Sequence, residues 1–153
     1  MESFIYVAPV LGVIALVFAF ILSGKVSREE VGTDRMKEIS TAISEGAHAF
    51  LTAEYKILAI FIIVLFILIG LGIGFGSAIA FVVGTLFSIL AGYFGMSVAT
   101  KANVRTANAA RNSGMNRALS IAFSGGAVMG MSVVGLGLLG VSIFYMVTND
   151  TNI

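Results

Sequence analysis

The sequence predicts an all-α fold, an integral membrane helical bundle with four transmembrane helices, and two observations support this. The first is composition: hydrophobic residues make up 58% of the chain, charged residues only 11%, and the mean hydropathy is +1.03. Soluble domains contain about 25% charged residues, so this composition is typical of a protein embedded in lipid. The second is spacing: uncharged runs of about 20 residues, the length needed to cross a bilayer, recur four times along the chain.

The uncharged runs place the spans. We predict one membrane unit over residues 1–153, with spans at about 4–22, 57–75, 78–100 and 118–147. The first run lacks the positive flank of a secretory signal and is longer than the apolar region of such a signal, so we expect a retained helix. The fourth run would be about 45 Å long as a helix, more than a hydrocarbon core of ~30 Å, so it must tilt, kink or project.

An amphipathic segment precedes the second span. Its apolar residues recur at steps of three and four, the pattern of one helix face: Met36, Ile39, Ile43, Ala47, Phe50 and Leu51. Asp34 suits the positive end of such a helix, as its cap or as an anion in the first turn. We therefore expect one long helix that starts near residue 34, continues through the second span, and lies half outside the hydrocarbon.

Three polar or glycine-rich stretches are expected to separate the spans. Residues 23–32 form a polar connector in which Ser27 and Glu30 have the spacing of a capping box. Glycines at positions 70, 72, 74 and 76 predict a turn between the second and third spans. Residues 101–117 are basic and rich in asparagine, so we expect a connector there that stays outside the hydrocarbon.

All nine lysines and arginines lie on one side of the predicted up-and-down bundle, within residues 25–56 or 101–117. By the positive-inside rule, the basic loops 23–56 and 101–117 face the cytoplasm and both termini lie outside a cell (inner) membrane. The cations of the second loop could also attract a polyanion or acidic lipid, although their role in orientation already explains them. No aromatic residue is interleaved with them, so we expect no nucleic-acid partner.

Small residues recur every four positions in the third span, and the chain contains 18 glycines. Such stripes let helix backbones approach closely in lipid, where apolar side chains gain little by leaving lipid for one another. We expect some stripes to pack within the chain and the remainder to face helices that the chain lacks. The stripes are Gly84, Ser88 and Gly92; Ala91, Gly95 and Ala99; and, in the fourth span, Gly126 and Gly130.

Short motifs that bind cofactors in other proteins have simpler explanations here. The segment from Gly135 to Gly140 matches G-x-G-x-x-G, but it lies deep in an apolar run, where helix packing explains the glycines. Glu45 and His48 have the spacing of a di-iron motif, which needs a second copy that a single histidine cannot supply. The sequon at Asn149 matters only in a eukaryotic secretory pathway. We therefore assign no catalytic, cofactor-binding or metal-binding residue.

The position of the acidic residues bears on a further class of function. None of the eight acidic residues lies within an uncharged run, and the chain has no cysteine. A path for a proton or cation through a membrane normally contains an ionisable residue inside the membrane. An independent channel or transporter is therefore disfavoured.

Ordered sequence blocks from about Met36 to Gly140 resemble those of the ion-translocating membrane pyrophosphatases. The blocks keep a consistent order and spacing over two-thirds of the chain, which makes the resemblance more specific than any single motif. They are Glu45-Gly46-Ala47, Glu54-Tyr55, Gly92-Tyr93, Gly95-Met96, Ala99-Thr100, Ala102-Asn103, Arg105-Thr106-Ala107, Ala118-Leu119, Ala122-Phe123 and Gly126-Ala127-Val128-Met129-Gly130.

The resemblance implies a function and a place within a larger assembly. Members of that family hydrolyse Mg²⁺-bound pyrophosphate on the cytoplasmic side and pump H⁺ or Na⁺ outward, with K⁺ as a further possible cofactor. They form homodimers of large helical subunits, and the residues that hold Mg²⁺-pyrophosphate and gate the ion come from later, inner-ring helices. By resemblance, the four helices here belong to the outer ring, and no family catalytic residue can be carried onto this chain.

We therefore predict the N-terminal portion of a membrane pyrophosphatase, non-catalytic by itself, that arises from a truncated gene, a split gene or deliberate shortening. Its expected partners are the lipid bilayer, the remaining helices of the pump and, in the full-length protein, a second copy. The alternative is a stand-alone small membrane protein that serves as an assembly or interaction subunit. The determinants of H⁺ versus Na⁺ coupling and of K⁺ dependence lie outside this chain.

Overall fold

The computed structural model describes residues 2–148, with side chains from residue 6 onward. Within those residues it contains four α-helices and no strand: α1 (Glu2–Arg28), α2 (Asp34–Gly72), α3 (Phe75–Asn112) and α4 (Met115–Thr148). Each helix is long and apolar enough to cross a membrane. The prediction of an all-α fold with four transmembrane helices is therefore confirmed. The sequon at Asn149 lies outside the described residues.

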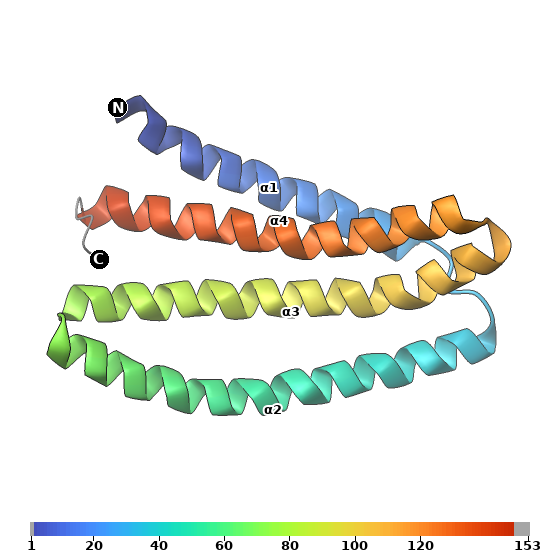
Figure 1. Ribbon diagram of the computed structural model, residues 1–153, viewed down its shortest axis with the longest axis horizontal. Coiled ribbons are helices and arrows are strands. Elements are labelled where there is room, and N and C mark those ends of the chain that lie inside the picture. Colours follow the sequence, from blue (N-terminus) through green and yellow to red (C-terminus); the bar gives the residue numbers. More distant parts are fainter. Residues whose placement is uncertain (1, 149–153) are drawn as a thin grey trace.

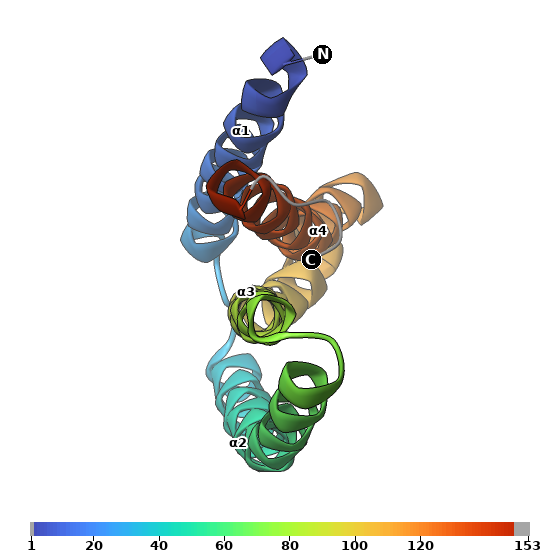
Figure 2. The same cartoon turned by 90° about the vertical axis from the view of Figure 1, so that its left-hand side faces the viewer.

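The four helices alternate in direction and form a single row (Figure 1). Their order in space is α1, α4, α3, α2, as the view along the row shows (Figure 2). α4 packs between α1 and α3, whereas α2 packs against α3 alone. Consecutive helices α1 and α2 are therefore neighbours in sequence but not in space. A row of this kind leaves broad apolar faces uncovered, and side chains such as Phe20 and Leu71 are more than four-fifths exposed (81% and 85%).

The two ends of the bundle, taken along the helix axes, differ in charge. At one end α1 finishes with Lys25 and Arg28 in its last turn, and α3 finishes with Arg111. The starts of α2 and α4 lie at the same end and carry Arg35 and Arg117 (right-hand side of Figure 1). We call this the basic end. The opposite end, where α2 passes into α3 and where the described chain begins and finishes, is the cation-free end.

α2 starts where the sequence predicted, but one of the predicted capping contacts is absent. The side chain of Thr33 is the N-cap and accepts a hydrogen bond of 3.4 Å from the backbone N–H of Met36. Asp34 lies in the first turn, where a carboxylate favours the positive end of the helix dipole. The predicted capping box at Ser27 and Glu30 is wrong, because Ser27 lies in the last turn of α1, which ends only at residue 28.

The basic segment 101–117 is helical over most of its length, so the loop predicted there is wrong, whereas its position outside the hydrocarbon stays a prediction. α3 continues to Asn112, and only Ser113 and Gly114 separate it from α4. The segment is rich in alanine, the strongest helix former, and polarity alone does not end a helix. The end comes where Gly114 takes a φ of 85°, while the N–H of Ser113 donates to the carbonyl of Ala109 at 2.8 Å.

The glycine-rich turn is also shorter than the sequence suggests. α2 includes Gly70 and Gly72, and α3 already includes Gly76, so the turn consists of Ile73 and Gly74 alone. Gly74 has a φ of 152°, a backbone conformation that residues with a side chain rarely adopt. One glycine of the four therefore makes the turn. The others stay helical because the hydrogen bonds of the flanking helices continue through them.

The helices extend well beyond the predicted spans at the basic end. α2 has 39 residues and α3 has 38. At 1.5 Å per residue each is about 57 Å long, nearly twice the thickness of a hydrocarbon core. α2 and α3 thus form a helical hairpin, one part of which must project from the membrane. The positions of the bilayer boundaries along each helix remain a prediction.

The amphipathic face of α2 is covered only in part. Leu51 is buried, and Met36 and Ala47 are half-buried, because α3 is the helix that packs against this face. Ile39 and Phe50 belong to the same predicted stripe but are exposed, at 47% and 57%. The apolar stripe is therefore wider than the surface that α3 covers.

Glycines bring α4 into close contact with both of its neighbours. A Cβ atom at Gly135 would lie 2.9 Å from the backbone oxygen of Gly12 in α1. A Cβ atom at Gly125 would lie 2.7 Å from the Cβ of Ala102 in α3. Neither position has room for a side chain, so the closeness of the three helices depends on these glycines.

The predicted small-residue stripes divide into covered and uncovered ones. Gly95 of α3 packs against Met129 of α4, where an added Cβ would lie 2.6 Å from the methionine Cγ. Gly92, Gly126 and Gly130, in contrast, would place a Cβ in open space, with nothing within 4 Å. Packing within the chain therefore uses one of the stripes in α3 and leaves the predicted stripe of α4 free.

Candidate functional site

The strongest cluster of polar contacts lies at the basic end, where residues 29–33 connect α1 to α2. The last four carbonyl groups of a helix have no partner within that helix, so other groups must satisfy them. Arg105 of α3 reaches across to this connection. Its Nε donates to the carbonyl of Glu29 at 2.9 Å, and its Nη2 donates to the carbonyl of Ser27 at 3.3 Å. The planar guanidinium thus ties the C-terminus of α1 to α3.

A third nitrogen of the same side chain holds it in place. Nη1 of Arg105 donates to the carbonyl of Lys101, one turn earlier in α3, at 2.9 Å. All three nitrogens therefore donate to backbone oxygens. A lysine could not reproduce this arrangement, because an ammonium group is a point charge without a planar fork.

Asn108, one turn further along α3, holds the next part of the connection. Its side chain is buried at 5% exposure and donates to the carbonyl of Glu30 at 3.2 Å. Its oxygen accepts from the Asn112 side chain at 3.0 Å. Gly32 lies directly against it: φ is 96°, and a Cβ atom would come within 2.6 Å of the Asn108 oxygen. Position 32 therefore requires glycine for both conformation and space.

An ion pair adds α4 to the same junction. Arg117, near the start of α4, donates from Nη2 to the carboxylate of Glu29. The arginine side chain is 49% exposed and the glutamate side chain 19%. A partly exposed pair of this kind contributes at most about 1 kcal/mol, so it helps to align the helices more than it stabilises them. We call the contacts of Arg105, Asn108 and Arg117 with the connection the polar junction.

Small apolar residues pack beneath the polar junction. Val26 of α1 is almost fully buried at 1% exposure and packs with Val98 and Ala102 of α3 and Val128 of α4. A second cluster near the α3–α4 turn contains Ala109, Ala118 and Ile121. The polar junction therefore closes one end of a tightly packed three-helix unit.

The side chains of the polar junction hold helices in position. Two of the four cations predicted as a possible polyanion-binding set, Arg105 and Arg117, are engaged by backbone oxygens and by Glu29. Lys101 and Arg111 are exposed. Arg117 is exposed as well, although it pairs with Glu29, so Arg105 alone of the four cations is partly buried.

A metal site has no donor set among the described residues. No three His, Cys, Asp or Glu side chains there lie close enough together to hold a metal ion. Glu45 and His48, which have the spacing of a di-iron motif, are both exposed on α2, and the His48 ring contacts Tyr93 of α3 with 6.2 Å between ring centroids. A Mg²⁺-phosphate complex needs a cage of several oxygen ligands, so the described residues do not fit one.

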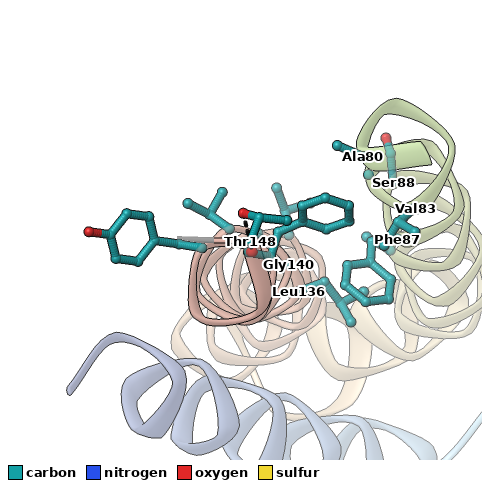
Figure 3. Close-up of a pocket in the computed structure, with 14 residues that line it drawn as sticks. Ala80, Val83, Phe87, Ser88, Leu136, Gly140 and Thr148 are labelled. Atoms are coloured by element: carbon teal, nitrogen blue, oxygen red, sulfur yellow. Dashed lines mark hydrogen bonds between the residues drawn. The ribbon is translucent and has the colours of Figure 1, made fainter. Parts of the chain in front are cut away.

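A second candidate site is an apolar groove between α3 and α4, towards the cation-free end. Its volume is about 590 Å³. Figure 3 shows Ala80, Val83, Phe87 and Ser88 from α3 beside Leu136, Gly140 and Thr148 from α4. Val133, Gly137, Val141, Phe144 and Tyr145 continue the α4 wall. The groove is open along its length, since Gly84 and Gly137 would each place a Cβ in free space.

Part of these two sites is visible in the sequence. The basic residues of 101–117 stand out, although as a connector, whereas no pattern predicted the roles of Asn108 and Gly32. A glycine next to the N-cap Thr33 was the available signal for a left-handed turn at that point. No signal in the sequence indicated which asparagine would reach it.

Together the fold and the two sites define a class of protein: a membrane-spanning helical unit whose polar residues position helices and whose apolar surface is incompletely covered. Comparison with known proteins makes this specific. Residues 13–153 match the family described as inorganic H⁺ pyrophosphatase. The match covers most of the chain, and the chain belongs to this family.

Individual relatives agree with the family match. The chain is 56% identical over 131 residues to a putative K⁺-stimulated pyrophosphate-energized sodium pump of Clostridium tetani, covering 86% of this chain and 19% of that protein. It is 44% identical over 155 residues to a K⁺-insensitive pyrophosphate-energized proton pump of Methanosarcina mazei, covering 100% of this chain and 23% of that protein. A K⁺-stimulated pyrophosphate-energized sodium pump of Thermotoga maritima is 43% identical over 135 residues, covering 88% and 19%.

The chain thus spans about a fifth of the length of these relatives (19% to 23%). The resemblance to a portion of a membrane pyrophosphatase, based on the ordered sequence blocks, is confirmed. Four membrane-length helices and this family membership make the chain an integral membrane protein. The relatives include both sodium and proton pumps, and both K⁺-stimulated and K⁺-insensitive ones.

Proposed function

We propose that the chain is the N-terminal helical unit of a pyrophosphate-energized cation pump and has no catalytic activity by itself. The observation that carries this proposal is its family membership together with its coverage of about a fifth of each relative. The absence of a converging set of carboxylates among the described residues is in keeping with it, because pyrophosphate hydrolysis needs Mg²⁺ held by several oxygen ligands.

In this proposal the unit supplies a scaffold for helices that carry the chemistry. The polar junction holds α1, α3 and α4 in register at the basic end. The basic end faces the cytoplasm and both termini lie outside, since all nine lysines and arginines lie in residues 25–56 or 101–117 and the cation-free end has none. Mg²⁺, and K⁺ where it is used, bind to other parts of the pump, and the complete subunit pairs with a second copy.

Hydrolysis measured with and without the rest of a pump tests this proposal. The purified chain should release no phosphate from Mg²⁺-pyrophosphate above a heat-denatured control. Co-expressed with the remainder of the Clostridium tetani relative, the chain should restore hydrolysis that the remainder alone lacks. Turnover by the isolated chain would refute the proposal.

The alternative, a stand-alone assembly or interaction subunit, makes a different prediction in the same experiment. In that case the chain should associate with a complete family member rather than with the remainder alone. Failure to restore hydrolysis, combined with binding to the complete pump, would favour this alternative.

A further inference from the structure

A shallow crevice lies between α1 and α4 at the basic end, where the last turn of α1 runs beside the first turns of α4 (Figure 1). Its floor is formed by Val26 and Ile121, which are 1% and 4% exposed. The apolar groove has no charged residue in its lining, but this crevice has three. The charged and hydroxyl groups at its rim are Lys25, Glu29, Arg117, Ser120 and Ser124.

The crevice lies where the uncharged runs of both helices end. Lys25 is the first charged residue after the uncharged residues 3–24 of α1. Arg117 is the last charged residue before the uncharged residues 118–149. The ion pair between Arg117 and Glu29 brings these two ends of the antiparallel helices together. Because uncharged runs mark the hydrocarbon, we expect the first cations beyond them to lie at the depth of the lipid headgroups.

Several hydrogen-bond donors at the rim have no partner among the residues that the structure describes. Arg117 uses Nη2 for the carboxylate of Glu29, which leaves its Nε and Nη1 free. The ammonium group of Lys25 and the hydroxyl of Ser120 are exposed and form no ion pair or hydrogen bond within the described residues. The hydroxyl of Ser124 differs, because it donates to the carbonyl of Ser120 at 2.7 Å. Three side chains can therefore donate to one anion in the crevice.

Exposed apolar side chains continue from the crevice along both helices. Phe18 of α1 precedes Lys25 by seven residues and is 45% exposed. Met131 of α4 follows Ser124 by seven residues and is 36% exposed. Seven residues are two helical turns, so each apolar side chain lies on the same face of its helix as the rim residue and about 10 Å from it. A ligand with a charged head and an apolar tail matches this order of groups.

We propose that the α1–α4 crevice binds the phosphate of an anionic phospholipid, with its acyl chains lying along α1 and α4. Lys25, Arg117 and Ser120 donate to the phosphate oxygens, and charge-assisted hydrogen bonds of this kind are the stronger ones. Glu29 opposes the anion, so the two cations and one carboxylate leave a single positive charge in the lining. That charge matches a phospholipid with one negative charge. A soluble pyrophosphate carries more charge and would leave the apolar surface uncovered.

Fluorescence quenching by brominated lipid measures this binding directly. The chain has no tryptophan, so Phe18→Trp provides a single probe at an exposed position below the crevice. In vesicles of mixed lipid, brominated phosphatidylglycerol should quench this probe more than the same fraction of brominated phosphatidylcholine. The expected relative binding constant is about five, the effect of one net positive charge at a membrane surface.

Variants at the rim, each with the same tryptophan probe, assign the preference to the crevice. Lys25→Gln and Arg117→Gln should each lower the relative binding constant to about one, because no net charge then remains. Lys25 has no partner within the described residues, so its replacement should leave the fold unchanged. Glu29→Gln should raise the constant about fivefold, because it removes the opposing carboxylate. Arg111→Gln is the matched control: this exposed cation lies at the same end but outside the crevice, and the constant should stay at about five.

Each possible result decides for or against the crevice. Equal quenching by the two lipids in the chain with wild-type rim residues would overturn the proposal. A loss in Arg111→Gln as large as that in Lys25→Gln would also overturn it, because the attraction would then come from general surface charge. Excess inorganic phosphate or pyrophosphate should leave the preference as it is in sodium chloride of equal ionic strength. Loss of the preference in either salt would make a soluble anion the ligand. Since no hydrolysis is measured, failure of the proposed function would leave this inference standing.

Discussion

The two ends of the α3–α4 pair are built from the same kinds of residue but finish differently. At the basic end the helices approach through Gly125 and Ala102, and the polar junction adds α1 with arginine and asparagine donors. Towards the cation-free end the same two helices leave a groove of about 590 Å³, with Phe87 on its floor. The two helices therefore pack closely at one end and leave an open apolar groove towards the other.

The glycines show what the difference means. Those of the complete contacts, such as Gly12, Gly95 and Gly135, have backbone or side-chain atoms closer than 3.0 Å to an added Cβ. Others are more exposed, such as Gly92 and Gly137, and have nothing within 4 Å of an added Cβ. The amino acid is the same, but the first group packs within this chain and the second makes no contact within it.

The largest effect is expected where a side chain is forced between two backbones. Gly135→Leu should destabilise the isolated chain by about 3 kcal/mol, because α1 and α4 must move apart at the contact with Gly12. Gly137→Leu, two residues away and facing open space, should change the free energy of unfolding little. Unfolding equilibria in mixed detergent micelles measure both. Equal destabilisation by the two variants would remove the distinction between covered and open glycines.

A smaller effect is expected at the polar junction. Arg105→Ala removes the donors for the carbonyls of Ser27 and Glu29, which should lower the unfolding free energy by about 2 kcal/mol. Arg105→Lys should recover only part of this, since an ammonium group cannot span both acceptors. Arg111→Ala, in the last turn of the same helix and exposed, is the control and should have almost no effect. A loss at Arg111 as large as that at Arg105 would contradict the assignment of the junction.

The smallest effect concerns the connection between α1 and α2. Gly32→Ala should cost about 1.5 kcal/mol, from the positive φ and the contact with Asn108. Gly114→Ala has a similar φ of 85° but no atom within 4 Å of its Cβ, so it should cost about 1 kcal/mol from backbone strain alone. The same unfolding assay resolves the order of the two. A larger cost at Gly114 would show that the contact with Asn108 contributes nothing.

Much of the fold follows from patterns that the sequence displays directly. Four uncharged runs predict four helices, and the concentration of cations in residues 25–56 and 101–117 predicts an up-and-down arrangement. The pairing of helices does not follow, because α1 packs against α4 and not against α2, and no local pattern encodes that choice. The small-residue stripes predict that contacts exist without saying which stripe meets which neighbour.

The candidate sites were less accessible from the sequence for a similar reason. Polarity and asparagine content in 101–117 suggested a connector, but alanine content and a single Gly114 decide where the helix ends. The polar junction joins Glu30 to Asn108, which are 78 positions apart. Contacts at that separation depend on how the helices are arranged in space, which single-helix patterns do not contain.

The basic end and the cation-free end should lie on opposite sides of a membrane, and single-cysteine labelling tests this most directly. Ser113 is exposed in the turn at the basic end, and Ile73, 74% exposed, lies in the turn at the cation-free end. Because the chain has no native cysteine, Ser113→Cys and Ile73→Cys each provide one site. With a membrane-impermeant maleimide, Ile73→Cys should label in intact cells, and Ser113→Cys only after the membrane is opened. Labelling of Ser113→Cys from outside intact cells would contradict the account.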